Sequence, residues 1–284
     1  MAVRPMQLLM SALADLRWEP VAPRLRAWLD GVPVLDTHAA RIVLEPGRVV
    51  PQYAVPAADV TAELVPAPGD AGPQHGPGPQ PIGPGGVEVL TPSTGFGVHS
   101  CPGRVLTVRV EGRERPGAAF APDDPDLAGY VVLDFDALDW REEDEPVVGH
   151  PRDPHHRVDV RHSSRRVRVT LDGHVLAASD RPVLVTETNL PVRWYLPAED
   201  VDPAHLRPSP TSSACAYKGV ARYWSAELPG GTVADVAWSY PEPLPGAEPV
   251  RDLVCFFDER VDVSVDGADP DRPRSEWTQR VDGR

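Results

Sequence analysis

An internal repeat is the feature that most constrains the fold of this 284-residue chain. Similar short blocks occur in the same order in its two halves. The matched positions are Leu-Asp-Gly at 29–31 and 171–173, Glu45 and Glu187, Tyr53 and Tyr195, Asp59 and Asp200, Cys101 and Cys215, and the segments 132–136 and 254–258. Several blocks in one order are hard to explain by chance, so the sequence predicts a tandem duplication of one structural unit.

The repeat also sets the expected domain boundaries. A stretch between the matched blocks of the first copy is rich in proline and glycine, and it holds too few bulky apolar residues to offset its ordering entropy. We therefore expect a mobile insertion there. The predicted organisation is an N-terminal helix over 1–17, a degenerate first copy over 18–148 with the insertion at 65–88, a connector over 149–164, an intact second copy over 165–270, and a tail over 271–284.

Each copy has the pattern of short strands joined by tight turns. Val167, Val169 and Leu171 alternate with polar residues, and the following Asp172-Gly173 pair is a favoured two-residue hairpin turn. The chain contains 35 prolines and 23 glycines, which favours many turns over long helices. Outside the N-terminal run, no segment sustains a helical period. The predicted fold class is all-β, with two tandem domains of short antiparallel strands.

Charge and cysteine usage exclude several classes of protein. A net charge of −14 argues against a nucleic-acid partner, because binding to a phosphate backbone needs a cationic surface. The three cysteines, Cys101, Cys215 and Cys255, form no C-x-x-C pair, which favours a reducing compartment over a disulfide framework or a structural zinc. The apolar N-terminal run is too short to span a bilayer. We expect a cytoplasmic protein without a membrane partner.

One residue type is unusually rare. The chain has 28 basic residues, of which Lys218 is the single lysine and the remaining 27 are arginine. Such a bias is typical of a GC-rich genome, in which arginine replaces lysine on ordinary surfaces. A lysine retained under this pressure has chemistry that a planar guanidinium does not reproduce, unless it persists by chance.

The residues around this lysine resemble a known bacterial family. The run from Cys215 to Gly219, Cys-Ala-Tyr-Lys-Gly, is similar to the Cys-Pro-Tyr-Lys-Gly of the family catalogued as domain of unknown function 427, in its duplicated form. Further matches over the second copy are Glu187-Thr, Trp194-Tyr195, Asp200-Val201, Tyr223-Trp224, and the segment 237–243. The resemblance implies a β-tent-like fold of two small sheets packed at an angle.

Two other properties of such relatives do not transfer to this chain. The fold class includes zinc-binding members, but the paired cysteines of those members are missing here, so we predict no metal. The family has also been labelled nucleotidyltransferase-like. The chain contains no glycine-rich phosphate loop, and its D-x-D spacing at Asp134 and Asp136 is weak evidence by itself. That label remains an alternative, and no cofactor is indicated.

Candidate functional residues concentrate in the second copy. We expect Lys218, Glu187 and Tyr195 to be the polar groups of a small-molecule pocket, either for binding alone or for catalysis. Lys218 could contact an anionic ligand, form a structural pair with Glu187, or be an exposed amine. The expected ligand-binding residues are Trp194, Cys215, Tyr217 and Tyr223, because aromatic groups with polar tips make good pocket walls.

Three alternatives stay open from the sequence. Cys215 is either a thiol activated by Lys218 or an inert buried residue. The histidines of the connector could hold a transition metal with Asp153, or they are simply part of a hydrophilic linker; they are His150, His155, His156 and His162. Finally, the tandem units could form a non-catalytic interaction module, which predicts a contiguous patch of exposed aromatic side chains and a closed core around Lys218.

Overall fold

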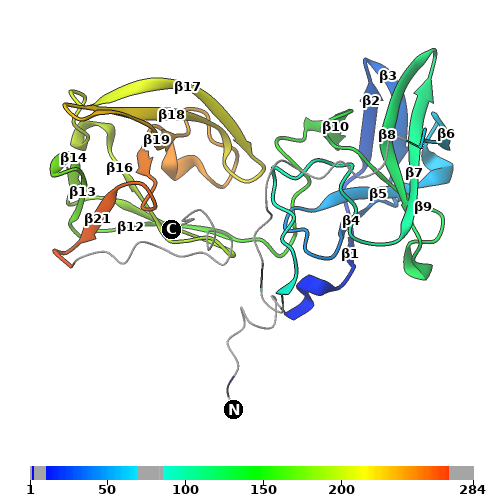
Figure 1. The fold of residues 1–284 in the computed structure, drawn as a ribbon, viewed down its shortest axis with the longest axis horizontal. Coiled ribbons are helices and arrows are strands. Elements are labelled where there is room, and N and C mark those ends of the chain that lie inside the picture. The colour runs from blue at the N-terminus through cyan, green and yellow to red at the C-terminus, as the bar shows by residue number, and fades with distance from the viewer. Residues whose placement is uncertain (1, 3–10, 70–82, 84–85, 269–284) are drawn as a thin grey trace. The chain divides into compact units, whose positions relative to one another are not determined.

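The structure is a computed structural model that describes residues 2, 11–69, 83 and 86–268 (Figure 1). The chain divides into two compact units between Asp153 and Pro154, here called unit 1 and unit 2. Both units are built from antiparallel strands, and no helix of seven or more residues occurs in the described ranges. The predicted all-β fold is confirmed. None of the described helices is long and apolar enough to cross a membrane.

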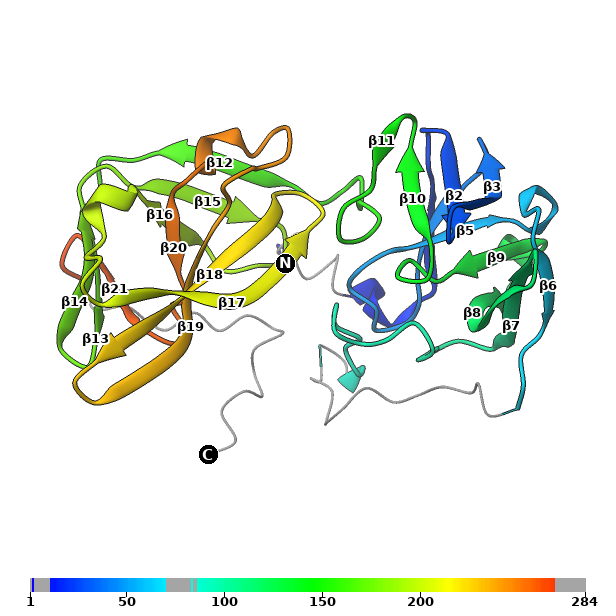
Figure 2. The same cartoon turned by 90° about the horizontal axis from the view of Figure 1, so that it is seen from above.

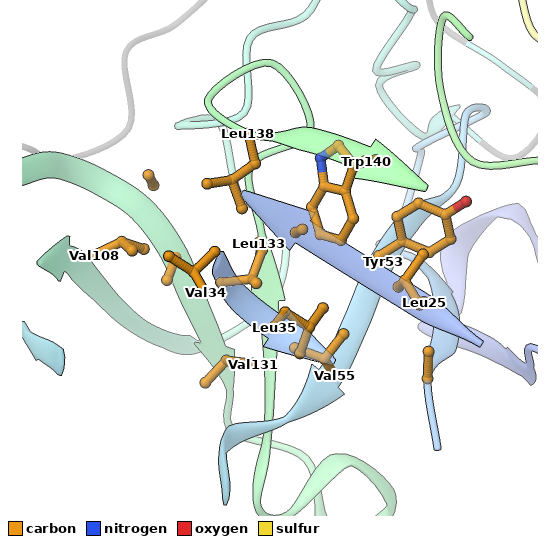
Figure 3. Packing of buried hydrophobic residues seen from close by; sticks show 14 of the residues in the cluster. Leu25, Val34, Leu35, Tyr53, Val55, Val108, Val131, Leu133, Leu138 and Trp140 are labelled. Carbon is orange, nitrogen blue, oxygen red and sulfur yellow. The ribbon is translucent and has the colours of Figure 1, made fainter. Parts of the chain in front are cut away.

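Unit 1 contains two sheets. Its seven-stranded sheet has the order β1 (Arg17–Pro20), β4 (Arg41–Leu44), β5 (Gln52–Pro56), β9 (Tyr130–Leu133), β8 (Arg113–Pro122), β7 (Gly103–Val110) and β6 (Glu63–Pro66). Its four-stranded sheet has the order β11 (Glu145–Pro146), β10 (Asp139–Glu142), β2 (Leu25–Leu29) and β3 (Val32–Thr37). The core between the sheets includes Leu25, Val55, Leu133 and Trp140 (Figure 3).

Unit 2 repeats this plan. Its seven-stranded sheet has the order β12 (Val158–His162), β15 (Val183–Glu187), β16 (Arg193–Leu196), β20 (Val254–Phe256), β19 (Gly231–Ser239), β18 (Gly219–Leu228) and β17 (Leu206–Cys215). Its three-stranded sheet has the order β14 (His174–Ser179), β13 (Val167–Leu171) and β21 (Asp262–Val265). The described 3-10 helices include η1 (Ala12–Ala14), η2 (Ala57–Asp59), η4 (Pro125–Leu127), η5 (Ala198–Asp200) and η6 (Glu248–Val250).

The two seven-stranded sheets correspond strand for strand. Position by position, the order in unit 1 matches the order in unit 2, and η2 and η5 follow equivalent strands. A shared order of this kind is what the predicted repeat demands. The duplication itself, as an event in the history of the chain, remains a prediction.

The strand register corrects one of the predicted matches. Val43 of β4 pairs with Gln52, and its equivalent Val185 of β15 pairs with Arg193. The connection after the matched glutamate is one residue shorter in unit 2, so Tyr53 is equivalent to Trp194 and not to Tyr195. By the same register, the equivalent of Tyr195 is Ala54. The predicted pairing of the two tyrosines was therefore wrong by one residue.

The predicted boundaries differ from the strands at several points. The expected connector, 149–164, includes β12, which pairs with β15 and forms an edge of the large sheet of unit 2. The expected N-terminal helix, 1–17, contains η1 and the first residue of β1, and its remaining described residues carry no other named element. Most of the predicted insertion, and the tail 271–284, lie outside the described residues.

Unit 2 buries side chains on both faces of its large sheet. Because successive residues of a strand point to opposite faces, Trp194 and Tyr195 of β16 lie on different sides. Trp194 packs in the core between the two sheets. The other side, called the outer face here, holds Val183, Val185, Tyr195, Ala221, Trp238, Tyr240, Ala247, Val250 and Cys255. It is covered by the segment that contains η6.

A glycine fixes the turn that carries the single lysine. Gly219 has φ +103°, and a Cβ built there would lie 3.0 Å from the carbonyl oxygen of Glu242. We expect Gly219→Ala to lower the free energy of unfolding of unit 2 by about 1 to 3 kcal/mol, as measured by urea denaturation. Gly230 lies in another turn with open space around it, so Gly230→Ala should change stability by less than about 0.5 kcal/mol. Equal effects of the two substitutions would contradict this assignment.

Candidate functional site

The single lysine is buried against a glutamate. Lys218 lies in the turn between β17 and β18 and is only 6% exposed. Its Nζ donates a hydrogen bond to Oε2 of Glu187, the last residue of β15. Strand β15 and the β17–β18 hairpin lie near opposite edges of the same sheet, with β20 between them (Figure 2). The sheet must therefore curve strongly, and the ion pair spans its concave end.

A histidine completes the environment of Glu187. Nε2 of His156 lies 3.0 Å from Oε1 of Glu187, so both carboxylate oxygens have partners. The ring of His156 stacks on Tyr217 with centroids 4.1 Å apart and an interplanar angle of 18°. Burial favours the protonated acid, but the hydrogen bond from His156 and the charge of Lys218 outweigh it, so the pKa of Glu187 lies below its ordinary value. The carboxylate is ionised at neutral pH, and His156 donates to it.

The strand register explains why His156 reaches this position. Val158 of β12 is the partner of Glu187 across the sheet, and His156 lies two residues earlier in the chain. We had placed this histidine in the connector with three others and not at the site. The signal was available: Val158 and Val160 alternate with Asp159 and Arg161, which is the pattern of a strand.

Two buried aromatic side chains form the centre of the outer face. Nε1 of Trp238 donates to the hydroxyl of Tyr195 at 3.0 Å, and both residues are buried. Burial raises the pKa of Tyr195 and of Tyr240 well above the ordinary value, with smaller contributions from nearby ionisable groups that include Glu187. These phenols are therefore protonated at neutral pH. They can donate or accept hydrogen bonds, but they are not bases.

The remaining predicted site residues are divided between two places. Tyr217 contacts His156, and Cys215 and Tyr223 pack against the outer face, where the hydroxyl of Tyr223 lies 2.8 Å from Oγ of Ser213. Trp194 does not join them. It lies on the opposite side of the sheet, in the core between the sheets, and so apart from the other predicted site residues. The cause is the alternation of neighbouring side chains along β16.

A second charged cluster, which the sequence did not predict, lies on the outer face of the large sheet. Arg193 donates to Asp258 at 3.2 Å and to both carboxylate oxygens of Glu259, at 3.0 and 2.6 Å. Its guanidinium lies 5.6 Å from the ring centroid of Trp238. Burial raises the pKa of Asp258 above its ordinary value despite the adjacent arginine. Arginine is so common in this chain that composition gave no reason to select it.

Unit 1 keeps the glutamate but not the lysine. Glu45 is fully buried; its carboxylate meets Nδ1 of His99 at 2.9 Å and the backbone N–H of Ser100 at 2.7 Å. Sγ of Cys101 lies 3.7 Å from the same carboxylate. Burial and then the charge of Glu45 raise the pKa of Cys101 to about 12, so this thiol is not a nucleophile at neutral pH.

Two further candidates from the sequence are the D-x-D spacing and a metal site at the histidines of the connector. The D-x-D spacing forms a local turn, in which the carboxylate of Asp134 accepts the backbone N–H of Asp136 at 3.1 Å. Within the described part of the chain, no three histidine, cysteine or acidic side chains are grouped so that they could hold a metal ion.

The register of the two sheets allows a comparison within the chain. On the outer face, the polar and large aromatic residues of unit 2 are not kept at the equivalent positions of unit 1. The equivalent positions are Arg193 and Gln52, Tyr195 and Ala54, Tyr223 and Val105, Trp238 and Phe120, and Cys255 and Val132. Since unit 1 forms the same sheet order without the unit 2 residues, the fold does not require them.

Comparison with known families agrees with the sequence resemblance. Residues 159–267 match the model of a family described as Domain of unknown function (DUF427). The matched stretch lies in unit 2 and includes Glu187, Tyr195 and Lys218, whereas His156 precedes it. No curated protein matches the chain. The suspected family resemblance is confirmed for unit 2, and the family's description names no activity.

The ion pair has a direct energetic test. We expect Glu187→Gln to destabilise unit 2 by about 3 kcal/mol, because it leaves a buried ammonium without a counter-charge. The double variant Glu187→Gln with Lys218→Met should recover most of that loss in urea denaturation. Glu199, whose pair with Arg181 is exposed, supplies the control: Glu199→Gln should cost less than about 1 kcal/mol. A double variant as unstable as the single one would refute the pairing.

Proposed function

We propose that unit 2 binds a small anionic molecule at the concave end of its large sheet, with Lys218 as the principal contact. The observation that carries this proposal is the comparison between the units. Both units hold a carboxylate with an imidazole partner, Glu187 with His156 and Glu45 with His99, but unit 2 adds the ammonium of Lys218 and several phenols on or beside one face, where unit 1 has mostly apolar residues. Polar groups that the shared sheet order does not require, gathered at one place, are typical of a binding site.

The charges at the site favour an anion. Lys218 and Glu187 cancel one another, and an incoming carboxylate or phosphate would compete with Glu187 for the ammonium. Glu187 would then keep its hydrogen bond from His156. Tyr195 and Tyr240 would supply hydroxyl groups for directional hydrogen bonds.

Binding is better supported than catalysis. The pKa of Glu187 is lowered, which makes its carboxylate a weak base, and the pKa of Tyr195 is raised, which keeps its phenol protonated. Neither group is suited to remove a proton at neutral pH. The catalytic role that we considered for Lys218, Glu187 and Tyr195 therefore remains the alternative.

Access to the lysine depends on the histidine. The side chains of Lys218 and Glu187 are 8% and 10% exposed, and that of His156 is 17% exposed. The stacked rings of His156 and Tyr217 are thus the outermost part of the site, and their displacement would open it.

We place this function in the cytoplasm, since the three cysteines are free.

A non-catalytic interaction module is the second candidate. The burial of Lys218 agrees with the closed core that this function predicts. In the described part of unit 2, the exposed large hydrophobic side chains are Leu190, Val192 and Val220, none of which is aromatic. The predicted patch of exposed aromatic residues is therefore not present among the described residues of unit 2, which favours the small-molecule proposal.

A thermal-shift screen of the full chain against small anionic metabolites tests the proposal. A ligand that binds only the folded state raises the melting temperature of the wild-type protein. We expect Lys218→Arg to abolish that rise while the protein stays folded, because a guanidinium does not fit the place of the ammonium. Arg222→Lys, an exposed exchange on β18, which follows the turn that carries Lys218, is the control and should keep the full response. An unchanged response in the Lys218→Arg variant would exclude the site.

A further inference from the structure

Unit 1 contains a hollow of about 670 Å³ that lies outside the site proposed for unit 2. Its volume falls within the roughly 300 to 1,000 Å³ that is usual for small-molecule sites. The lining comes from β2, β10, β11 and the segment before β10, and it combines aromatic residues with two arginines: Arg26, Trp28, Phe135, Trp140 and Arg141.

The aromatic side of the hollow is held rigidly. The rings of Phe135 and Trp140 are parallel with centroids 6.1 Å apart, and Nε1 of Trp140 donates to the carbonyl oxygen of Phe135 at 3.0 Å. Tyr53 packs against Trp140 with centroids 5.0 Å apart, and Figure 3 shows both rings beside Leu25 at one end of the core. Trp140 is 4% exposed and belongs to the core between the sheets, so these rings support the hollow from the core side and leave Trp28 as the aromatic surface open to a ligand.

The arginine side carries a carboxylate that is easily replaced. Arg26 pairs with Asp144 at 2.7 Å, and its guanidinium lies 5.7 Å from the ring centroid of Trp28. Arg141 donates to the backbone carbonyl of Asp144 at 2.7 Å. The side chain of Asp144 is 98% exposed, so its pair with Arg26 contributes little stability. Its carboxylate marks the position at which a ligand's carboxylate would bind.

The aromatic lining of this hollow is particular to unit 1. Unit 2 has a hollow of about 610 Å³ on the corresponding face, which includes Arg166, Arg168 and Ser264 but no aromatic residue. By strand register, Arg26 is equivalent to Arg168, but Trp28 is replaced by Thr170, Trp140 by Val263 and Arg141 by Ser264. Strand β11 has no equivalent in the described part of unit 2. Unit 2 therefore forms the corresponding sheet without the aromatic residues and the second arginine, and the fold does not explain their presence.

We propose that unit 1 binds an aromatic carboxylate in this hollow. The flat apolar part lies against Trp28, and the carboxylate replaces that of Asp144 on Arg26. Arginine recognises a carboxylate through paired N–H donors, and it stacks on aromatic rings, so one side chain serves both parts of the ligand.

Binding of 2-naphthoate to the full chain tests this inference. Isothermal titration measures the affinity, and the indole N–H signals in ¹H–¹⁵N spectra report where the probe binds. We expect the signal of Trp28, identified by its loss in Trp28→Thr, to shift on titration. Arg26→Gln should weaken binding by at least about tenfold, because a charge-assisted hydrogen bond is lost. The neutral analogue 2-naphthalenemethanol should bind more weakly by a similar factor.

Matched variants separate this site from the one in unit 2. Arg168→Gln changes the equivalent arginine of unit 2, and Lys218→Arg changes the other proposed site; neither should alter the affinity for 2-naphthoate. Trp28→Thr places the residue of unit 2 on the same strand and should also weaken binding. The inference is overturned if the probe leaves the Trp28 signal unchanged at millimolar concentration, if the alcohol binds equally well, or if Arg26→Gln and Arg168→Gln have equal effects.

Discussion

The buried pair of Lys218 and Glu187 is the interaction on which the arrangement of unit 2 depends. Removing two charges from water costs several kcal/mol per ion, and the pair is stable only when its geometry and further hydrogen bonds offset that cost. Here His156 occupies the second carboxylate oxygen, and the curved sheet brings β15 to the turn between β17 and β18. The edge strand β12 is part of this arrangement because it carries His156 to the site.

The two units use one sheet order for different chemistry. Unit 2 places polar and aromatic residues on the outer face of its large sheet, whereas unit 1 fills the same face with smaller or apolar residues such as Ala54 and Val132. Unit 1 instead adds aromatic residues and an arginine to its smaller sheet, around β10 and β11. The two proposed sites therefore lie on different sheets, the large sheet in unit 2 and the small sheet in unit 1.

Local patterns gave much of this fold from the sequence. Alternating residues predicted the strands, and the rarity of lysine selected Lys218, which the structure places beside Glu187. Register was harder: a connection shorter by one residue matched Tyr53 to Tyr195 instead of Trp194. The neighbours Trp194 and Tyr195 were both expected at the site, although they point to opposite faces of the sheet. His156 was missed because the alternation over residues 158–161 was not interpreted as a strand. The hollow of unit 1 was missed because it depends on contacts between residues far apart in the chain, which composition and periodicity do not show.

The absence of any other lysine provides the most direct measurement of the buried pair. Reductive methylation with formaldehyde modifies primary amines, so Lys218 is the one side chain that reacts, and peptide mass spectrometry follows its rate. Burial and pairing with Glu187 predict that Lys218 reacts much more slowly in the native protein than in the urea-unfolded chain, and that Glu187→Gln removes part of this protection. A native rate equal to the unfolded rate would show that the ammonium is free in solvent and would contradict the account.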